Sequence, residues 1–262
     1  MSNTLSIAAS WGHSMSPYLF IGRRPRGFTL IEVVMVIVIT GILATIAVRQ
    51  MSGTIQSARY EQTLRELNAL AFAIAGNPDL HVGGVRTDYG YVGDVGALPP
   101  NLEALRSNPS GLATWAGPYM GTGVNADDFK TDGWGVVYSY TDTLIRSIGS
   151  GSNLDKIFAR TSAALLSNQV TGFVRDARQS SPGSGYADSL LVRLTYPDGS
   201  GNLASAAVNP APDGSFAFTG IPIGVHDLQI VFIPENDTIS MSVGVDPGSV
   251  VRVDVAFPAA LF

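Results

Sequence analysis

One acidic side chain stands inside a long apolar stretch near the beginning of the chain. From Phe28 to Val48 the sequence runs for 21 residues with Glu32 as its single ionisable side chain. A carboxylate in such a helix costs about 2.5–3.5 kcal/mol on entering a membrane, so it is by default a functional residue with a partner. Cleavage after Gly27 would supply that partner, because the new α-amino group of Phe28 would lie about one helical turn from Glu32, or opposite the Glu32 of a neighbouring copy. In the alternative interpretation, Glu32 only marks the start of a helix, where the helix dipole favours an acid.

The apolar stretch has the length of a membrane-spanning helix. At ~1.5 Å per residue, a helix of this length covers the ~30 Å hydrocarbon core of a bilayer. Its Val, Ile and Thr content favours a strand, but a lone strand leaves its backbone groups unpaired in lipid, so a helix is expected. Arg23, Arg24 and Arg26 precede the stretch, which predicts a cytoplasmic amino-terminal end and an exported chain after Arg49.

The residues around the predicted cleavage point resemble a known processing signal. An arginine-rich leader, the sequence Gly-Phe-Thr-Leu-Ile-Glu at 27–32 and an apolar helix resemble the class III signal of type IV pilins and type II secretion pseudopilins. The resemblance implies that a prepilin peptidase cuts after Gly27, that Phe28 becomes the methylated amino-terminal residue, and that Glu32 guides the registration of subunits in a filament. An ordinary secretory signal has a shorter apolar core and a small-residue cleavage site downstream, which makes cleavage near Ala47 the alternative.

The chain as a whole is predicted to be an α+β protein of five segments. A long amino-terminal helix carries a small α/β head, and an all-β sandwich of the immunoglobulin-like or transthyretin-like kind follows. The leader starts at Met1 or at Met15. The predicted segments are the prepilin leader 1–27, the transmembrane part of the pilin helix 28–48, the periplasmic or extracellular head 49–155, the linker 156–169 and the sandwich 170–262.

The helix is expected to start at Phe28, to continue to Ala75 and then to support the head. A Gly-Asn-Pro sequence at 76–78 is a typical stop signal. In the head we expect a loop at 92–100, a short helix from Asn101, and a Gly-Trp-Gly turn that leads into a strand; this order resembles that of the major pseudopilin of type II secretion. Beyond Arg49 the helix is expected to become amphipathic, with one apolar face formed by Leu64, Leu67, Ala71 and Ile74.

The carboxy-terminal third has the pattern of an antiparallel β-sandwich. Short β-rich runs alternate with turn dipeptides such as Asp198-Gly199 and Asp213-Gly214, and residues 156–169 are expected to form a connecting helix. The order of runs and turns resembles the carboxypeptidase-regulatory or transthyretin-like sandwich, which implies a fold rather than a ligand. The seven predicted strands are 170–174, 190–196, 203–208, 216–219, 226–233, 239–245 and 250–257.

Nothing in the sequence has the pattern of an enzyme. There is no cysteine, and none of His13, His81 and His226 begins a zinc motif. Removal of the three leader arginines leaves 13 basic and 21 acidic residues, a net charge of −8, which argues against nucleic acid as a partner. We expect no catalytic residue, no metal and no cofactor; relatives often bind calcium after the hairpin, but two acids make a poor ligand set. The calcium candidates are Asp142, Ser150, Ser152, Asn153 and Asp155.

These features together predict a structural subunit of a filament. The resemblance implies a homo-oligomer with helical symmetry, a prepilin peptidase, an inner-membrane platform and an assembly ATPase as partners. The chain would be a single-pass inner-membrane protein before assembly and part of a periplasmic or cell-surface filament afterwards. Two alternatives stay open: a low-copy minor pilin or adhesin that binds through its sandwich, and a membrane-anchored binding protein that never polymerises.

The processing signal gives a direct prediction. Gly27→Ala should block removal of the leader, because the resemblance places the cut immediately after this glycine. Immunoblotting should show the variant at the size of the precursor, while Gly41→Ala, the same exchange inside the apolar stretch, should be processed normally. Unchanged processing of Gly27→Ala would contradict the class III assignment.

Overall fold

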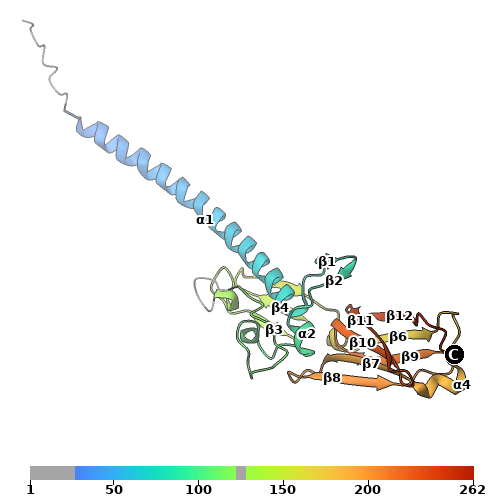
Figure 1. Cartoon of the computed structure of the whole chain (residues 1–262). Coiled ribbons are helices and arrows are strands. Elements are labelled where there is room, and N and C mark those ends of the chain that lie inside the picture. Colours follow the sequence, from blue (N-terminus) through green and yellow to red (C-terminus); the bar gives the residue numbers. More distant parts are fainter. Residues whose placement is uncertain (1–26, 122–127) are drawn as a thin grey trace, which may run out of the picture. The chain divides into compact units, whose positions relative to one another are not determined.

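The computed structural model describes residues 27–121 and 128–262 (Figure 1). The leader arginines and Met15 lie outside these residues. The described chain falls into two compact units, one up to Ser52 and one from Gly53 to Phe262, and each is described by itself. The helix α1 (Leu30–Ala75) is a single element that begins in the first unit and ends in the second.

The end of α1 is fixed by two features of the residues that follow it. Gly76 has a φ of 78°, a left-handed conformation that glycine adopts without strain. The Arg86 Nη2 donates a hydrogen bond of 2.5 Å to the carbonyl oxygen of Ala75, so a cation neutralises the negative end of the helix dipole. The predicted stop after Ala75 is confirmed.

The head is assembled from short elements around the last turns of α1. Leu67, Ala71 and Ile74 are buried as the spacing predicts, and Leu64 is half-buried. The elements that follow are β1 (His81–Val82), β2 (Val85–Arg86), α2 (Gly90–Val95), the 3₁₀ turns Leu102–Leu105 and Asp128–Lys130, the antiparallel sheet β3 (Ser139–Thr141), β4 (Leu144–Ser147) and β5 (Leu154–Ile157), and α3 (Ser162–Leu166).

Three expectations for the head need correction. The loop predicted at 92–100 is wrong at its start, because residues 90–95 form α2, which buries Tyr91, Val92 and Val95 in the head core. The strand after the Gly-Trp-Gly turn begins only at Ser139. The helix expected at 156–169 is shorter, because 156–157 belong to β5 and the helical residues are those of α3 alone.

A buried carboxylate organises the loop between Asp128–Lys130 and β3. The Asp132 Oδ1 accepts hydrogen bonds from the backbone N–H groups of Trp134 (3.0 Å) and Val136 (2.9 Å). Its Oδ2 accepts one from the Ser147 hydroxyl (2.5 Å) and one from the Gly149 N–H (3.0 Å). Burial alone would raise the pKa of Asp132, but these four hydrogen bonds outweigh burial and lower the pKa below its ordinary value.

The carboxy-terminal part consists of two sheets with a shared apolar core. All seven predicted strands are confirmed to within a few residues. One sheet has the order β11-β10-β7-β8 and the other the order β12-β6-β9. The strands are β6 (Asn168–Arg175), β7 (Leu190–Pro197), β8 (Leu203–Val208), β9 (Ser215–Ile221), β10 (Gly224–Phe232), β11 (Asp237–Val245) and β12 (Val250–Ala256), with α4 (Gly183–Tyr186) between β6 and β7.

The prediction of a purely antiparallel sandwich is wrong for one pair of strands. β12 runs parallel to β6, with Val250 opposite Gln169 and Ala256 opposite Arg175. The alternation of buried and exposed residues along β12 is as expected, because alternation reports which face is packed and is the same for either strand direction. The turns at Gly199 and Gly214 have φ values of 81° and 86°, as the Asp-Gly dipeptides predict.

Hydrogen bonds join the sandwich to the head inside the second unit. The Gly199 N–H in the β7–β8 turn donates to the carbonyl oxygen of Val95 at the end of α2 (2.9 Å). The Ile223 N–H donates to the carbonyl oxygen of Leu165 in α3 (2.8 Å), and the Ile223 side chain belongs to the head core. Residues of the β9–β10 connection therefore help to complete the core of the head.

The bonding of Asp132 predicts an acid-sensitive head. Asp132→Asn should lower the free energy of unfolding by about 1–3 kcal/mol at pH 7, because the amide donates where the carboxylate accepts. Since the folded pKa is lowered, the stabilisation is fully present above the unfolded pKa of about 3.9 and is lost as the pH falls through the folded pKa. Chemical denaturation at pH 7 and pH 3 should show a smaller loss on acidification in the variant. Asp155→Asn, an exposed carboxylate of the same head, is the control and should change stability less.

Candidate processing and assembly site

The first half of α1 presents an apolar surface that the described chain does not cover. Every residue from Gly27 to Gln62 is exposed, and the large apolar side chains between Phe28 and Val48 have exposed fractions of 46–85%. Soluble proteins seldom leave so much contiguous apolar surface in water. By length and composition α1 is suited to cross a membrane.

The amino-terminal end of the helix is organised by Thr29 and Glu32. The Glu32 N–H donates to the Thr29 hydroxyl (3.3 Å) and to the Thr29 carbonyl oxygen (3.1 Å), which makes Thr29 the capping residue and starts the helix at Leu30, two residues later than predicted. Glu32 is the third residue of the helix, the position of the acid in a capping box. The carboxylate of Glu32 therefore lies where the helix dipole favours a negative charge.

Gly27 and Phe28 precede the helix and are accessible. Both are exposed and have no regular secondary structure, as a protease substrate requires. A Cβ atom at Gly27 would find no other atom within 4 Å, so Gly27→Ala leaves the local structure unchanged. Any effect of that exchange would therefore not come from a local steric clash.

The structure does not gather the calcium candidates into a site. Asp155 on β5 pairs with Arg146, at 2.6 Å from the Arg146 Nε to Oδ1 and 2.8 Å from Nη2 to Oδ2. The hydroxyls of Ser150 and Ser152 bond to each other at 3.2 Å. Within residues 27–121 and 128–262, no three Asp, Glu or His side chains are grouped as metal ligands.

The surroundings of His226 indicate a structural role rather than a catalytic one. It is buried in β10, and its Nε2 lies 2.7 Å from the carbonyl oxygen of Pro222. Burial lowers the pKa of His226, so the ring is neutral near pH 7 and donates from Nε2 to the carbonyl. His81 is exposed on β1, far from His226 in the sequence, and His13 lies outside the described residues.

Comparison with known proteins bears on the first half of the helix. A family model described as the prokaryotic N-terminal methylation motif matches residues 22–48. The chain carries a pilin-type processing motif. The crystal structure of BcpA, the major pilin subunit of Bacillus cereus, is a structural neighbour with 11% sequence identity and a TM-score of 0.24. That match covers 45% of this chain and 37% of the BcpA chain, too weak a likeness to argue from. No curated protein matches the chain.

The exposed apolar helix predicts how the chain partitions. Replacing Ile39 and Leu43, one helical turn apart in the middle of the stretch, by lysine should add about 5–7 kcal/mol to the cost of entering the bilayer. Fractionation should then move the chain from the membrane pellet to the soluble fraction. Met51→Lys, an equally exposed position beyond the stretch, should leave the chain in the pellet, and a double variant that also stays there would contradict a spanning role for the helix.

Proposed function

We propose that this chain is the precursor of a pilin-like structural subunit that is cleaved after Gly27, methylated at Phe28 and polymerised through its helix. The observation that carries the proposal is the coincidence of two features over the same residues. The methylation motif covers residues 22–48, and residues 28–48 form the exposed apolar surface. A surface that needs cover and a motif typical of subunits that pack side by side support the same conclusion.

Cleavage gives Glu32 a second role. In the precursor, the carboxylate lies in the first turn of the helix beside the Thr29 cap. After cleavage, the secondary amine of the methylated Phe28 is positively charged and lies within a few residues of Glu32 or faces the Glu32 of an adjacent copy. Pairing them removes two uncompensated charges from an apolar bundle. The same pairing sets the axial register of neighbouring helices, because a helix shifted by a few residues leaves both charges unpaired.

The rest of the assembly system follows from this proposal. Prepilin peptidase would process the chain at the inner membrane, and a platform protein with an assembly ATPase would extract the helix from the lipid. We assign the sandwich to the carboxypeptidase-regulatory or transthyretin-like class and place it on the outside of the filament. About 90 residues added to each subunit would thicken a pseudopilus confined to the periplasm, which favours a surface filament; the order of the head elements favours the secretion family.

The alternative functions make different predictions about abundance. A low-copy minor pilin or adhesin would carry the sandwich as a binding module at few positions, and an anchored protein would be absent from filaments. Electron microscopy and gel analysis of sheared surface material separate the three. A major subunit dominates the preparation and begins with methylated phenylalanine.

The proposed pairing predicts separate effects on processing and assembly. Glu32→Ala and Glu32→Gln should both leave leader removal intact and reduce filament formation strongly, because each removes the negative charge. Immunoblots measure processing and electron microscopy counts filaments. Thr45→Ala removes another polar group of the apolar stretch, one that bonds within the helix to the carbonyl oxygen of Gly41 (2.8 Å), and should assemble normally. Normal filaments in Glu32→Gln would exclude charge pairing as the basis of assembly.

A further inference from the structure

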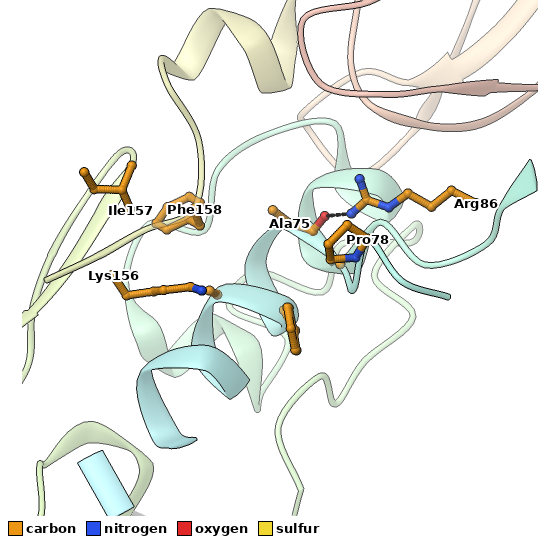
Figure 2. A pocket seen from close by; sticks show the side chains of 9 residues that line it. Ala75, Pro78, Arg86, Lys156, Ile157 and Phe158 are labelled. Atoms are coloured by element: carbon orange, nitrogen blue, oxygen red, sulfur yellow. Dashed lines mark hydrogen bonds between the residues drawn. The ribbon is translucent and has the colours of Figure 1, made fainter. Parts of the chain in front are cut away.

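The groove at the end of α1 is lined by an arginine that is already bonded. Figure 2 shows the hydrogen bond that the Arg86 guanidinium donates to the carbonyl oxygen of Ala75. The Arg86 Nε donates to the carbonyl oxygen of Asp88 (2.8 Å), and its Nη1 lies 3.7 Å from the Asp246 Oδ1. The groove, of about 240 Å³, therefore leaves Arg86 no unpaired charge to offer a ligand.

A second cavity, of about 330 Å³, lies inside the second unit where α2 meets the sandwich. β7 and β10 pair with each other only as far as Thr195 and Asp227. The start of β10 comes close to α2, since a Cβ atom at Gly224 would lie 3.1 Å from the carbonyl oxygen of Gly93. The lining includes the polar side chains of Asp94, Thr114, Thr195, His226 and Asp227.

Two of these polar side chains have a buried atom without a partner. His226 is 1% exposed, and within the described part of the chain its Nδ1 has no hydrogen-bond partner. Its Nε2 donates to the carbonyl oxygen of Pro222 (2.7 Å), which is not a lining residue, so Nδ1 is the ring nitrogen left for the cavity. In this tautomer Nδ1 accepts a hydrogen bond. The hydroxyl of Thr114 is likewise buried and unpaired, and such groups are costly until a partner binds them.

The charge of the lining selects the kind of partner. Among the described residues, those around this cavity include two carboxylates and no Lys or Arg. The Asp94 Oδ2 accepts from the Tyr119 hydroxyl (2.8 Å), and its other oxygen is left for a second donor. Burial raises the pKa of Asp94, because its negative charge lies in a poorly solvated place. A cation that donates hydrogen bonds suits such a lining, and an anion does not.

The rest of the lining suits a compact body with both polar and apolar faces. Leu203 and Val225 are 65% and 49% exposed and line the cavity. The ring of Tyr196 is part of the lining, 6.3 Å from the His226 ring between centroids. Apolar and aromatic walls with a few convergent polar groups are typical of small-molecule sites.

We propose that this cavity binds an amino sugar with a free amino group. The ammonium group has three N–H donors and one positive charge, which match the carboxylates of Asp94 and Asp227 and the lone pair of the His226 Nδ1. The sugar hydroxyls match the hydroxyls of Thr114 and Thr195. The inference goes beyond the proposed function, because the site would serve a major subunit, a minor subunit or an anchored protein alike.

Binding of matched sugars tests the proposal. The full-length chain in detergent micelles is titrated with glucosamine at pH 7, and saturation-transfer NMR measures the dissociation constant. Glucose and N-acetylglucosamine, which lack the charge, should bind at least about tenfold more weakly. Equal binding of glucose, or no binding of glucosamine, would overturn the proposal. Butylamine that binds as tightly as glucosamine would overturn the assignment to a sugar.

Variants of the two carboxylates locate the site. Asp227→Asn, at an exposed position of β10, should weaken glucosamine binding about tenfold, and so should Asp94→Asn where circular dichroism shows an intact fold. Glu235→Gln, an exposed residue of the β10–β11 turn outside the lining, is the control and should bind as the unchanged chain does. Unaltered binding in Asp227→Asn would place the ligand elsewhere and overturn the proposal. Leader removal and filament formation are read separately, so either outcome leaves the proposed function intact.

Discussion

The apolar surface between Phe28 and Val48 is the constraint on which the rest of the structure depends. A fold can bury such a surface against itself, but here the first buried residue of α1 is Thr63. The remaining surface needs a cover from outside the chain, first lipid and then, in our proposal, neighbouring helices. Neither lipid nor packed helices supply water to this surface. The carboxylate of Glu32 is therefore costly there unless a compensating charge lies nearby.

The head folds without any disulfide, because the chain contains no cysteine. Two of its charged groups bind backbone atoms directly. Asp132 collects three N–H groups and one hydroxyl, and Arg86 closes the end of α1. Charge-assisted hydrogen bonds of this kind are stronger than neutral ones and fix geometry as well as energy.

Long periodic patterns were predictable from the sequence, and contacts between distant residues were not. The helix follows from the length of its apolar stretch, and the seven sandwich strands follow from β-rich runs and turn dipeptides. Residues 90–95 were missed as a helix because Gly90 and Gly93 weaken the helical pattern, and packing against the head core overrides that preference. The role of Asp132 was not predictable, since nothing local reveals that Ser147 and Gly149 return to it. Gly27, Phe28 and Glu32 were recognisable because their motif is contiguous, and their roles remain proposals.

The parallel pairing of β12 with β6 also bears on how the exported chain matures. The first strand of the sandwich receives its neighbour from residues about 80 positions later, so its edge stays open until the last described strand is in place. Contacts of such long sequence separation form slowly. Until β12 pairs with β6, the open edge of β6 is able to pair with another copy of the chain. In the exported subunit that we propose, a chaperone that shields this edge until β12 has paired would protect the chain.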